Sequence, residues 1–329
     1  MNAAKNWVDL HVHLAALPTP DNGCLLSART RRLPLARWLL WRLNIDLADP
    51  EGSNRRYVEL LAERVRTSRW VRQVVLLGFD GVYDAAGRLD PARTHFMISN
   101  DYLFAVCRQF PEFLPGPSIN PQRRDALDEV DRCAAAGAVL VKLLPNVQHI
   151  NPAEPRYRPF YRRLAEHRLP LLVHGGHEFA LGAVDQSLGD PNLVQPALDE
   201  GVTVITAHAG STGLLLVENL WLRVQRLIRR YRHYYLDSSA LCSPNRFLTA
   251  LKIRRCPEMQ ERLLYGSDYP VPVLPQPFVW QLGWRRCREL AREANPLDRN
   301  VEVQRALGYR FASWPPGTRL AALPSAEAM

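Results

Sequence analysis

Two histidines near the amino end of the chain have a spacing that suits metal binding. In Asp9-Leu10-His11-Val12-His13 the polar residues occupy every second position. On a strand, this spacing points the three polar side chains to one face and the aliphatic ones to the other. Two neighbouring imidazoles inside a protein are difficult to satisfy without a shared metal, and Asp9 could steady them from one layer below. The pattern predicts a metal site, although an exposed strand with incidental histidines would carry the same short motif.

Three more polar residues stand where apolar runs end. His174, His208 and Asp268 each close a short hydrophobic stretch. A single histidine in such a place is more often a core or capping residue. The pattern recurs at four strand ends, however, when the strand of His11 and His13 is included, and this repetition argues against coincidence. In barrel enzymes the catalytic groups lie at the carboxyl ends of the strands, so we expect these side chains to converge there.

The elements that must position these residues follow an alternating pattern. Short apolar runs alternate with amphipathic helical stretches, as in a parallel sheet that is buried on both faces. The eight predicted strands are Val8–Leu14, Val71–Phe79, Phe113–Ile119, Ala138–Leu144, Leu169–His174, Val202–His208, Tyr234–Ser239 and Leu263–Asp268. Eight such units predict an α/β fold, a closed (β/α)8 TIM barrel.

The spacing after the first strand is too long for one helix. We therefore expect residues 15–55 to be an insertion in a single barrel domain, residues 1–314, followed by a flexible tail, residues 315–329. Within the insertion, Leu33–Leu47 is apolar nearly all round. We interpret it as a helix that covers the barrel mouth or joins two subunits in a homodimer, in preference to a helix on a membrane surface.

The ordered motifs of the chain resemble those of the amidohydrolase superfamily. The resemblance is to the amidohydrolase 2 group, which includes aminocarboxymuconate semialdehyde decarboxylase, and it spans nearly the whole chain. The motifs are Asp9-Leu-His-Val-His13, Val141-Lys-Leu-Leu-Pro145, His174-Gly-Gly-His-Glu178, Ala207-His-Ala-Gly210 and Tyr265-Gly-Ser-Asp-Tyr-Pro270. The resemblance implies that the metal ligands are His11, His13, His174 and Asp268, with His208 and Asp268 as catalytic residues.

Three imidazoles and a carboxylate suit one divalent metal. Zn²⁺ is the expected ion from the ligand types, and Mn²⁺, Fe²⁺ or Co²⁺ would fit the same set. Water bound to zinc can lose a proton near pH 7, and His208 could shuttle a proton beside it.

Lys142 and three loop residues are further candidates. Lys142 lies near the end of the fourth predicted strand. Elsewhere in the superfamily a lysine at this place can be carbamylated and bridge two metals. Because the resemblance is to the single-metal branch, the alternative is an unmodified Lys142 that pairs with a carboxylate. His177 and Glu178 follow the fifth strand and His149 follows the fourth. All three are candidates for substrate contact, since loops at this face carry the binding groups.

Composition excludes several classes of protein. Hydrophobic residues make up 47% of the 329 residues and charged residues 23%, as in a globular protein with a sizeable core. No apolar run is long enough to span a membrane and no signal peptide is evident, so we expect a cytoplasmic protein. The six cysteines show no metal-binding or disulfide spacing. The net charge of +9 favours a small, anionic substrate, whereas its dispersed arginines do not predict nucleic-acid binding.

Three functions remain compatible with the sequence. The first is a metal-dependent hydrolase that directs a metal-bound water at a small amide, ester or lactone. The second is a non-oxidative decarboxylase, a lyase, acting on an aromatic or unsaturated carboxylic acid. The third is a non-catalytic barrel that acts as a binding subunit and predicts no metal.

Overall fold

Eight parallel strands form the centre of the molecule. The computed structural model describes residues 6–179, 181, 185–214 and 219–323. The strands are β1 (Trp7–His13), β3 (Val71–Leu77), β5 (Phe113–Gly116), β6 (Val141–Leu143), β7 (Leu171–Val173), β8 (Val204–Thr206), β9 (Tyr234–Asp237) and β10 (Leu263–Leu264). Each coincides with one of the eight predicted runs, apart from Trp7, which precedes the first run by one residue, and this confirms the sequence interpretation.

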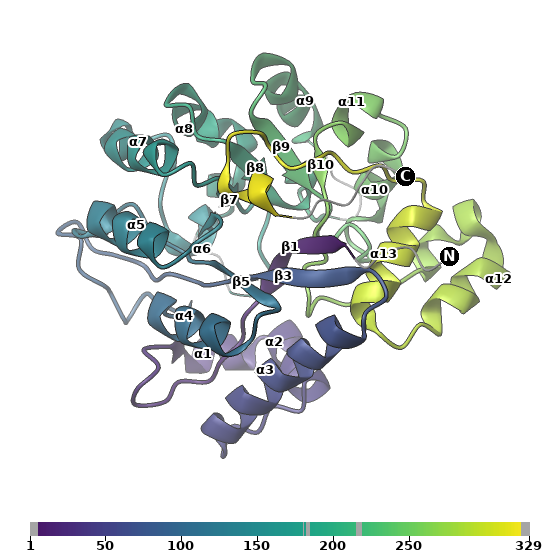
Figure 1. The fold of residues 1–329 in the computed structure, drawn as a ribbon, viewed down its shortest axis with the longest axis horizontal. Coiled ribbons are helices and arrows are strands. Elements are labelled where there is room, and N and C mark those ends of the chain that lie inside the picture. The colour runs from purple at the N-terminus through teal and green to yellow at the C-terminus, as the bar shows by residue number, and fades with distance from the viewer. Residues whose placement is uncertain (1–5, 180, 182–184, 215–218, 324–329) are drawn as a thin grey trace.

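The strands pair in chain order around a barrel. Hydrogen bonds join β1, β3 and β5 in one sheet and β6 to β10 in another. Parallel bridges link the two sheets on both sides, between Ser118 and Lys142 and between Val12 and Tyr269. The arrangement is the predicted (β/α)8 barrel, and Figure 1 shows the helices placed around its strands.

Helices follow most strands and begin at recognisable caps. The longer ones are α3 (Pro50–Thr67), α4 (Asn100–Gln109), α5 (Ala126–Ala135), α7 (Arg158–Glu166), α9 (Trp221–Arg230), α12 (Val279–Ala291) and α13 (Pro296–Ala306). The shorter ones are α1 (Ala28–Arg32), α2 (Pro34–Arg42), α6 (Pro145–Gln148), α8 (Gln195–Asp199), α10 (Phe247–Ile253) and α11 (Pro257–Gln260). Asp49 and Ser99 accept backbone N–H groups at the starts of α3 and α4, as good N-caps do.

The insertion after β1 is shorter than predicted. Helix α3 already begins at Pro50, so the added structure consists of α1, α2 and the strand β2 (Leu25–Leu26), which pairs with β4 (Phe96–Met97). The predicted helix over Leu33–Leu47 is reduced to α2, because Leu33 is extended and Asn44 has a positive φ. Leu39 of α2 lines the pocket at the barrel mouth, whereas Trp41 is 77% exposed.

The segment after residue 314 differs from the predicted flexible tail over its described part. Leu320 is fully buried and packs with Trp314, Leu10 and Leu172 in the barrel interior. Arg319 donates hydrogen bonds to carbonyl oxygens of Ala134, Ala138 and His167, which precede β6 and β7. Figure 1 shows this yellow segment crossing the end of the barrel. The segment therefore covers the amino ends of the strands, and residues 324–329 of the predicted tail lie outside the described residues.

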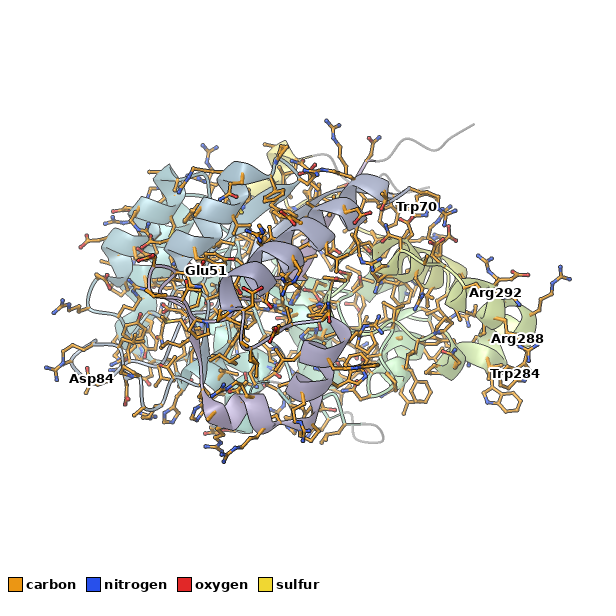
Figure 2. All side chains as sticks on the ribbon, turned by 90° about the horizontal axis from the view of Figure 1, so that it is seen from below. Glu51, Trp70, Asp84, Trp284, Arg288 and Arg292 are labelled. Atoms are coloured by element: carbon orange, nitrogen blue, oxygen red, sulfur yellow. The ribbon has the colours of Figure 1, made fainter. Side chains whose placement is uncertain are left out.

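Helix α12 lies at one end of the molecule and exposes both apolar and charged side chains. Figure 2 shows Trp284 and Arg288 of α12, and Arg292 directly after it, at this end of the molecule. Within the described part of the chain, no helix combines the length and apolar character needed to cross a membrane.

Candidate active site

Three of the four predicted metal ligands meet in one cluster at the carboxyl end of the barrel. Asp268 Oδ1 lies 2.9 Å from His13 Nε2 and 3.3 Å from His11 Nε2. The three ligand atoms lie within 4.8 Å of one another. His11 and His13 come from β1, and Asp268 follows β10, the neighbouring strand across the barrel seam. Barrel closure thus brings the first and last strands together at the cluster.

A bulge in β1 turns both histidines into the barrel. Asp9 pairs with Val74 and Val12 pairs with Leu76, so β1 has one residue more than β3 between these pairs. An extra residue breaks the two-residue alternation on which the sequence prediction depended. Leu10 consequently packs in the barrel interior rather than against the helices. The predicted separation of polar and aliphatic side chains onto opposite faces of β1 therefore fails at Leu10.

Asp9 supports the backbone of the site instead of the imidazoles. Its Oδ1 accepts hydrogen bonds from the N–H groups of His11, at 3.1 Å, and Ser267, at 2.9 Å. Burial raises the pKa of Asp9 to about 7. The predicted role in steadying the imidazoles is corrected accordingly: Asp9 ties β1 to the segment that carries Asp268.

Asp237 at the end of β9 is the residue that orients the histidines, and the sequence analysis missed it. Its Oδ2 accepts a hydrogen bond from His11 Nδ1 at 2.7 Å, and its Oδ1 accepts the N–H of His208 at 2.8 Å. Burial raises the pKa of Asp237. A carboxylate behind a ligand histidine places the proton on Nδ1 and leaves the lone pair on Nε2, which faces the cluster. Its position at the end of a predicted strand was the available clue.

His174 and His208 form a second pair beside the cluster. His208 Nε2 lies 3.3 Å from His174 Nδ1, and His208 Nδ1 lies 3.1 Å from the carbonyl oxygen of Ser239. A carbonyl oxygen can only accept, so the proton of neutral His208 is on Nδ1. Its Nε2 therefore accepts a hydrogen bond from His174 Nδ1. His174 Nε2 is then left with a lone pair, and among the described residues it has no hydrogen-bond partner. His174 itself lies outside the close cluster of ligand atoms.

The buried histidines are neutral and Asp268 is ionised. Burial, reinforced by the charges of Lys142 and Arg246, holds the pKa values of His11 and His174 well below their usual range, and burial with Arg246 does the same for His208. Burial alone would raise the pKa of Asp268, but the hydrogen bond from His13 and the neighbouring charges lower it. Neutral imidazoles and a carboxylate are the forms that bind metal. The donor set therefore fits a divalent ion held by His11, His13 and Asp268, with His174 Nε2 as the buried lone pair nearby.

Lys142 lies inside the barrel next to the cluster. Its Nζ is 3.4 Å from His11 Nε2 and the residue is fully buried. Burial lowers the pKa of Lys142 to about 8. At this pKa only about a tenth of the amine is uncharged at pH 7, and the uncharged amine is the form that carbamylation requires.

The pocket above the cluster has a volume of about 210 Å³. His177 and Glu178, the candidates for substrate contact after the fifth strand, line it together with His13, His174, His208 and Asp268. His149 does not: it is exposed and its Nδ1 contacts Arg93. The fold therefore places His149, the residue that ends α6, outside this pocket, and its contact with substrate stays a prediction.

One cation in the pocket wall was not singled out from the sequence. Arg246 lines the pocket, and its guanidinium lies 3.4 Å from the carbonyl oxygen of His177. It belongs to the loop between β9 and α10, and the residue is 6% exposed. One arginine among many carries no distinguishing mark in the sequence, so only the fold identifies it.

The comparisons with known proteins agree with this geometry. The family model described as Amidohydrolase matches residues 8–301. No curated protein sequence matched the chain significantly. An uncharacterized TIM-barrel protein from Bordetella bronchiseptica is similar in structure, with a TM-score of 0.57, 17% identity, and coverage of 92% of this chain and 99% of that one.

Two further solved structures are similar over almost the whole chain. One is a protein described as a probable 2-pyrone-4,6-dicarboxylic acid hydrolase from Acinetobacter baumannii, with a TM-score of 0.54, 13% identity, and coverage of 92% and 95%. The other is 5-carboxyvanillate decarboxylase from Sphingomonas paucimobilis, with a TM-score of 0.52, 15% identity, and coverage of 93% and 98%. These likenesses show a shared barrel fold, and the match to the family model over residues 8–301 shows that the chain belongs to the amidohydrolase family.

Proposed function

We propose that the chain is a metal-dependent hydrolase of a small, anionic carbonyl substrate, an ester, lactone or amide. The observation that carries the proposal is the cluster of His11, His13 and Asp268, with neutral His208 beside it at the base of one pocket. A divalent ion held by these ligands and His174, with Zn²⁺ the expected one, would supply Lewis acidity and make a water molecule acidic enough to ionise near neutral pH.

The chain's own residues supply the proton transfers. A water oxygen forms a bond to the substrate carbonyl carbon, and the bond from that carbon to the leaving oxygen or nitrogen breaks. Neutral His208 can take up the proton at Nε2 once the N–H of His174 turns away from that lone pair, and can return it to the leaving group, while its Nδ1 keeps the hydrogen bond to the Ser239 carbonyl oxygen. Arg246, in the pocket wall, can hold an anionic group of the substrate.

The test is turnover by the metal-loaded protein on panels of esters, lactones and amides. We expect His208→Ala to lower kcat by about 10²- to 10⁴-fold with an unchanged metal content, since the ligands stay in place. His233→Ala is the matched control, because the Nε2 of His233 contacts the carbonyl oxygen of Leu198 on α8 and His233 does not line the pocket. Equal losses in the two variants, or no turnover in any panel, would contradict the proposal.

Decarboxylation is the second candidate, favoured by the buried cation Arg246 and by the similarity to a decarboxylase structure. Release of carbon dioxide from hydroxybenzoate-type acids would support it over hydrolysis. A non-catalytic binding barrel would hold no metal, so elemental analysis separates that alternative from both.

We further propose a single ion rather than two. The uncharged fraction of Lys142 could react with carbon dioxide, but the amine already contacts His11 Nε2, and it is expected to remain unmodified. One equivalent of metal per chain, unchanged when bicarbonate is added, is the expected result. Two equivalents together with a carbamate signal in ¹³C NMR would establish the two-metal alternative.

A further inference from the structure

A second cavity lies between the inserted helices and the barrel mouth. Its volume is about 120 Å³. We call it the apolar annex, and it is defined by Leu26, Ala36, Leu39, Leu40, Leu43 and Ile45. Leu26 belongs to β2, the next three belong to α2, and the last two lie just beyond that helix. The annex is therefore a product of the insertion, not of the barrel.

The annex adjoins the active-site pocket. Ala15, Leu39, Phe96, Leu181 and Pro270 line both cavities. Ala15 is two residues after His13, and Pro270 is two residues after Asp268. The loops that carry the cluster thus continue directly into the wall between the two cavities. A molecule at the cluster would have the annex as its apolar neighbour.

The polar residues in the annex wall are already engaged. The hydroxyl of Thr30 donates to the carbonyl oxygen of His95 at 3.0 Å. The side-chain amide of Asn54 donates to the carbonyl oxygen of Leu17 at 2.9 Å and accepts the Leu17 N–H at 2.7 Å. Arg31, the remaining polar residue of the wall, is solvent-exposed. A group placed in the annex therefore meets mainly aliphatic and aromatic carbon.

We propose that the apolar annex holds an apolar substituent of the substrate while the reacting carbonyl or carboxylate lies at the His11–His13–Asp268 cluster. This proposal rests on the proposed function, because it places the reaction at the same site. An apolar cavity of about 150 Å³ accommodates benzene, so the somewhat smaller annex is suited to a short alkyl chain or a similarly compact apolar group. The substrate class is a small acid, or an ester or lactone of one, with a polar end and an apolar end.

The experiment measures binding rather than turnover. Calorimetric titration of the metal-loaded protein with straight-chain carboxylates, from acetate to octanoate, gives affinity against chain length. Each methylene that enters the annex is expected to tighten binding about 4-fold, until the cavity is full and the affinity levels off. A flat series, or no binding by any member, overturns the proposal.

Two opposite substitutions on α2 locate the effect. Ala36→Trp fills the annex and should make the affinity level off at a shorter chain, whereas Leu40→Ala enlarges it and should extend the rise to a longer chain. Trp41→Ala changes the solvent-facing side of the same helix, where Trp41 is 77% exposed, and should leave the series as in the wild type. If both annex variants keep the wild-type chain-length profile, the alkyl chain binds elsewhere and the proposal is wrong.

The outcome is separable from that of the proposed function. A protein that hydrolyses none of the substrates tested can still show the chain-length dependence and its response to Ala36→Trp and Leu40→Ala. If the protein hydrolyses a substrate but its affinity for carboxylates does not depend on chain length, the proposed function stands and the role of the annex in substrate binding is rejected.

Discussion

The histidines of the site depend on partners that lie far away in the sequence. His11 and Asp237 are separated by 226 positions, yet their side chains are joined by a hydrogen bond of 2.7 Å. The same carboxylate accepts the N–H of Ser239 and of His208. One buried acid therefore sets the tautomer of a predicted ligand and the backbone position of the predicted proton carrier.

This arrangement predicts the effect of Asp237→Asn. The amide is uncharged and brings N–H donors to a place where four groups already donate: His11 Nδ1, the N–H groups of His208 and Ser239, and the Ser239 hydroxyl. His11 therefore loses its fixed orientation. We expect metal affinity to fall about 10- to 100-fold, as is common when the support of a ligand histidine is removed. Competition with a chromogenic chelator measures the change.

Asp80→Asn is the matched control for this prediction. Asp80 is also buried, but it accepts hydrogen bonds from Gly81, Asn120 and Tyr83 and none from the site histidines. The metal affinity of the Asp80→Asn variant should stay near the wild-type value. An equal loss in both variants would indicate a general effect on folding and contradict the specific role of Asp237.

At the scale of elements, the turn after β7 determines where His174 and His177 lie. Gly176 has a φ of +84°, and its N–H donates to the carbonyl oxygen of Gly189 at 2.9 Å. A Cβ at this position would collide with the carbonyl oxygen of Ser211. The turn therefore needs glycine both for its left-handed backbone and for the close approach of a neighbouring loop.

We expect Gly176→Ala to lower the free energy of unfolding by about 3 kcal/mol or more, from left-handed strain plus overpacking. Gly201→Ala is the control: Gly201 has a φ of +82°, but no other described atom lies within 4 Å of an added Cβ. Strain alone should cost about 1 kcal/mol there. Urea unfolding monitored by circular dichroism gives both values, and equal costs would show that the contact with Ser211 is unimportant.

At the scale of the whole molecule, the barrel is closed at one end by the insertion and at the other by the carboxyl-terminal segment. Helix α2 stands over the mouth, where Leu39 lines the pocket. Leu320 lies against the opposite end of the barrel interior with Val8, Leu10 and Leu264. The segment after residue 314 is consequently part of the core.

Leu320→Ala should therefore destabilise the whole barrel. Removal of a fully buried leucine side chain typically costs about 2–5 kcal/mol through lost burial and the cavity that remains. Leu222→Ala removes a leucine that is 69% exposed on α9 and should change stability by less than about 0.5 kcal/mol. Thermal and urea unfolding of the two variants would test this, and a neutral Leu320→Ala would mean that the segment packs only loosely.

The amino-acid sequence by itself determined the barrel and the convergence of its polar strand ends. The apolar runs predicted the number of strands. Because catalytic groups in barrel enzymes lie at the carboxyl ends of the strands, the sequence also predicted that His11, His13 and Asp268 lie close together. These inferences succeeded because strand periodicity and barrel closure depend on local pattern and on topology, both of which are written along the chain.

Tertiary structure alone decided which buried acid supports His11, which cation lines the pocket, and which segment covers the amino ends of the barrel strands. Asp9 was the natural choice from spacing, but a one-residue bulge moved Leu10 inward and left the orienting role to Asp237 on a distant strand. Arg246 and Leu320 have no sequence mark that separates them from other arginines and leucines. The physical reason is that bulges, long-range hydrogen bonds and burial arise from packing between elements, and the sequence pattern within one element does not contain them.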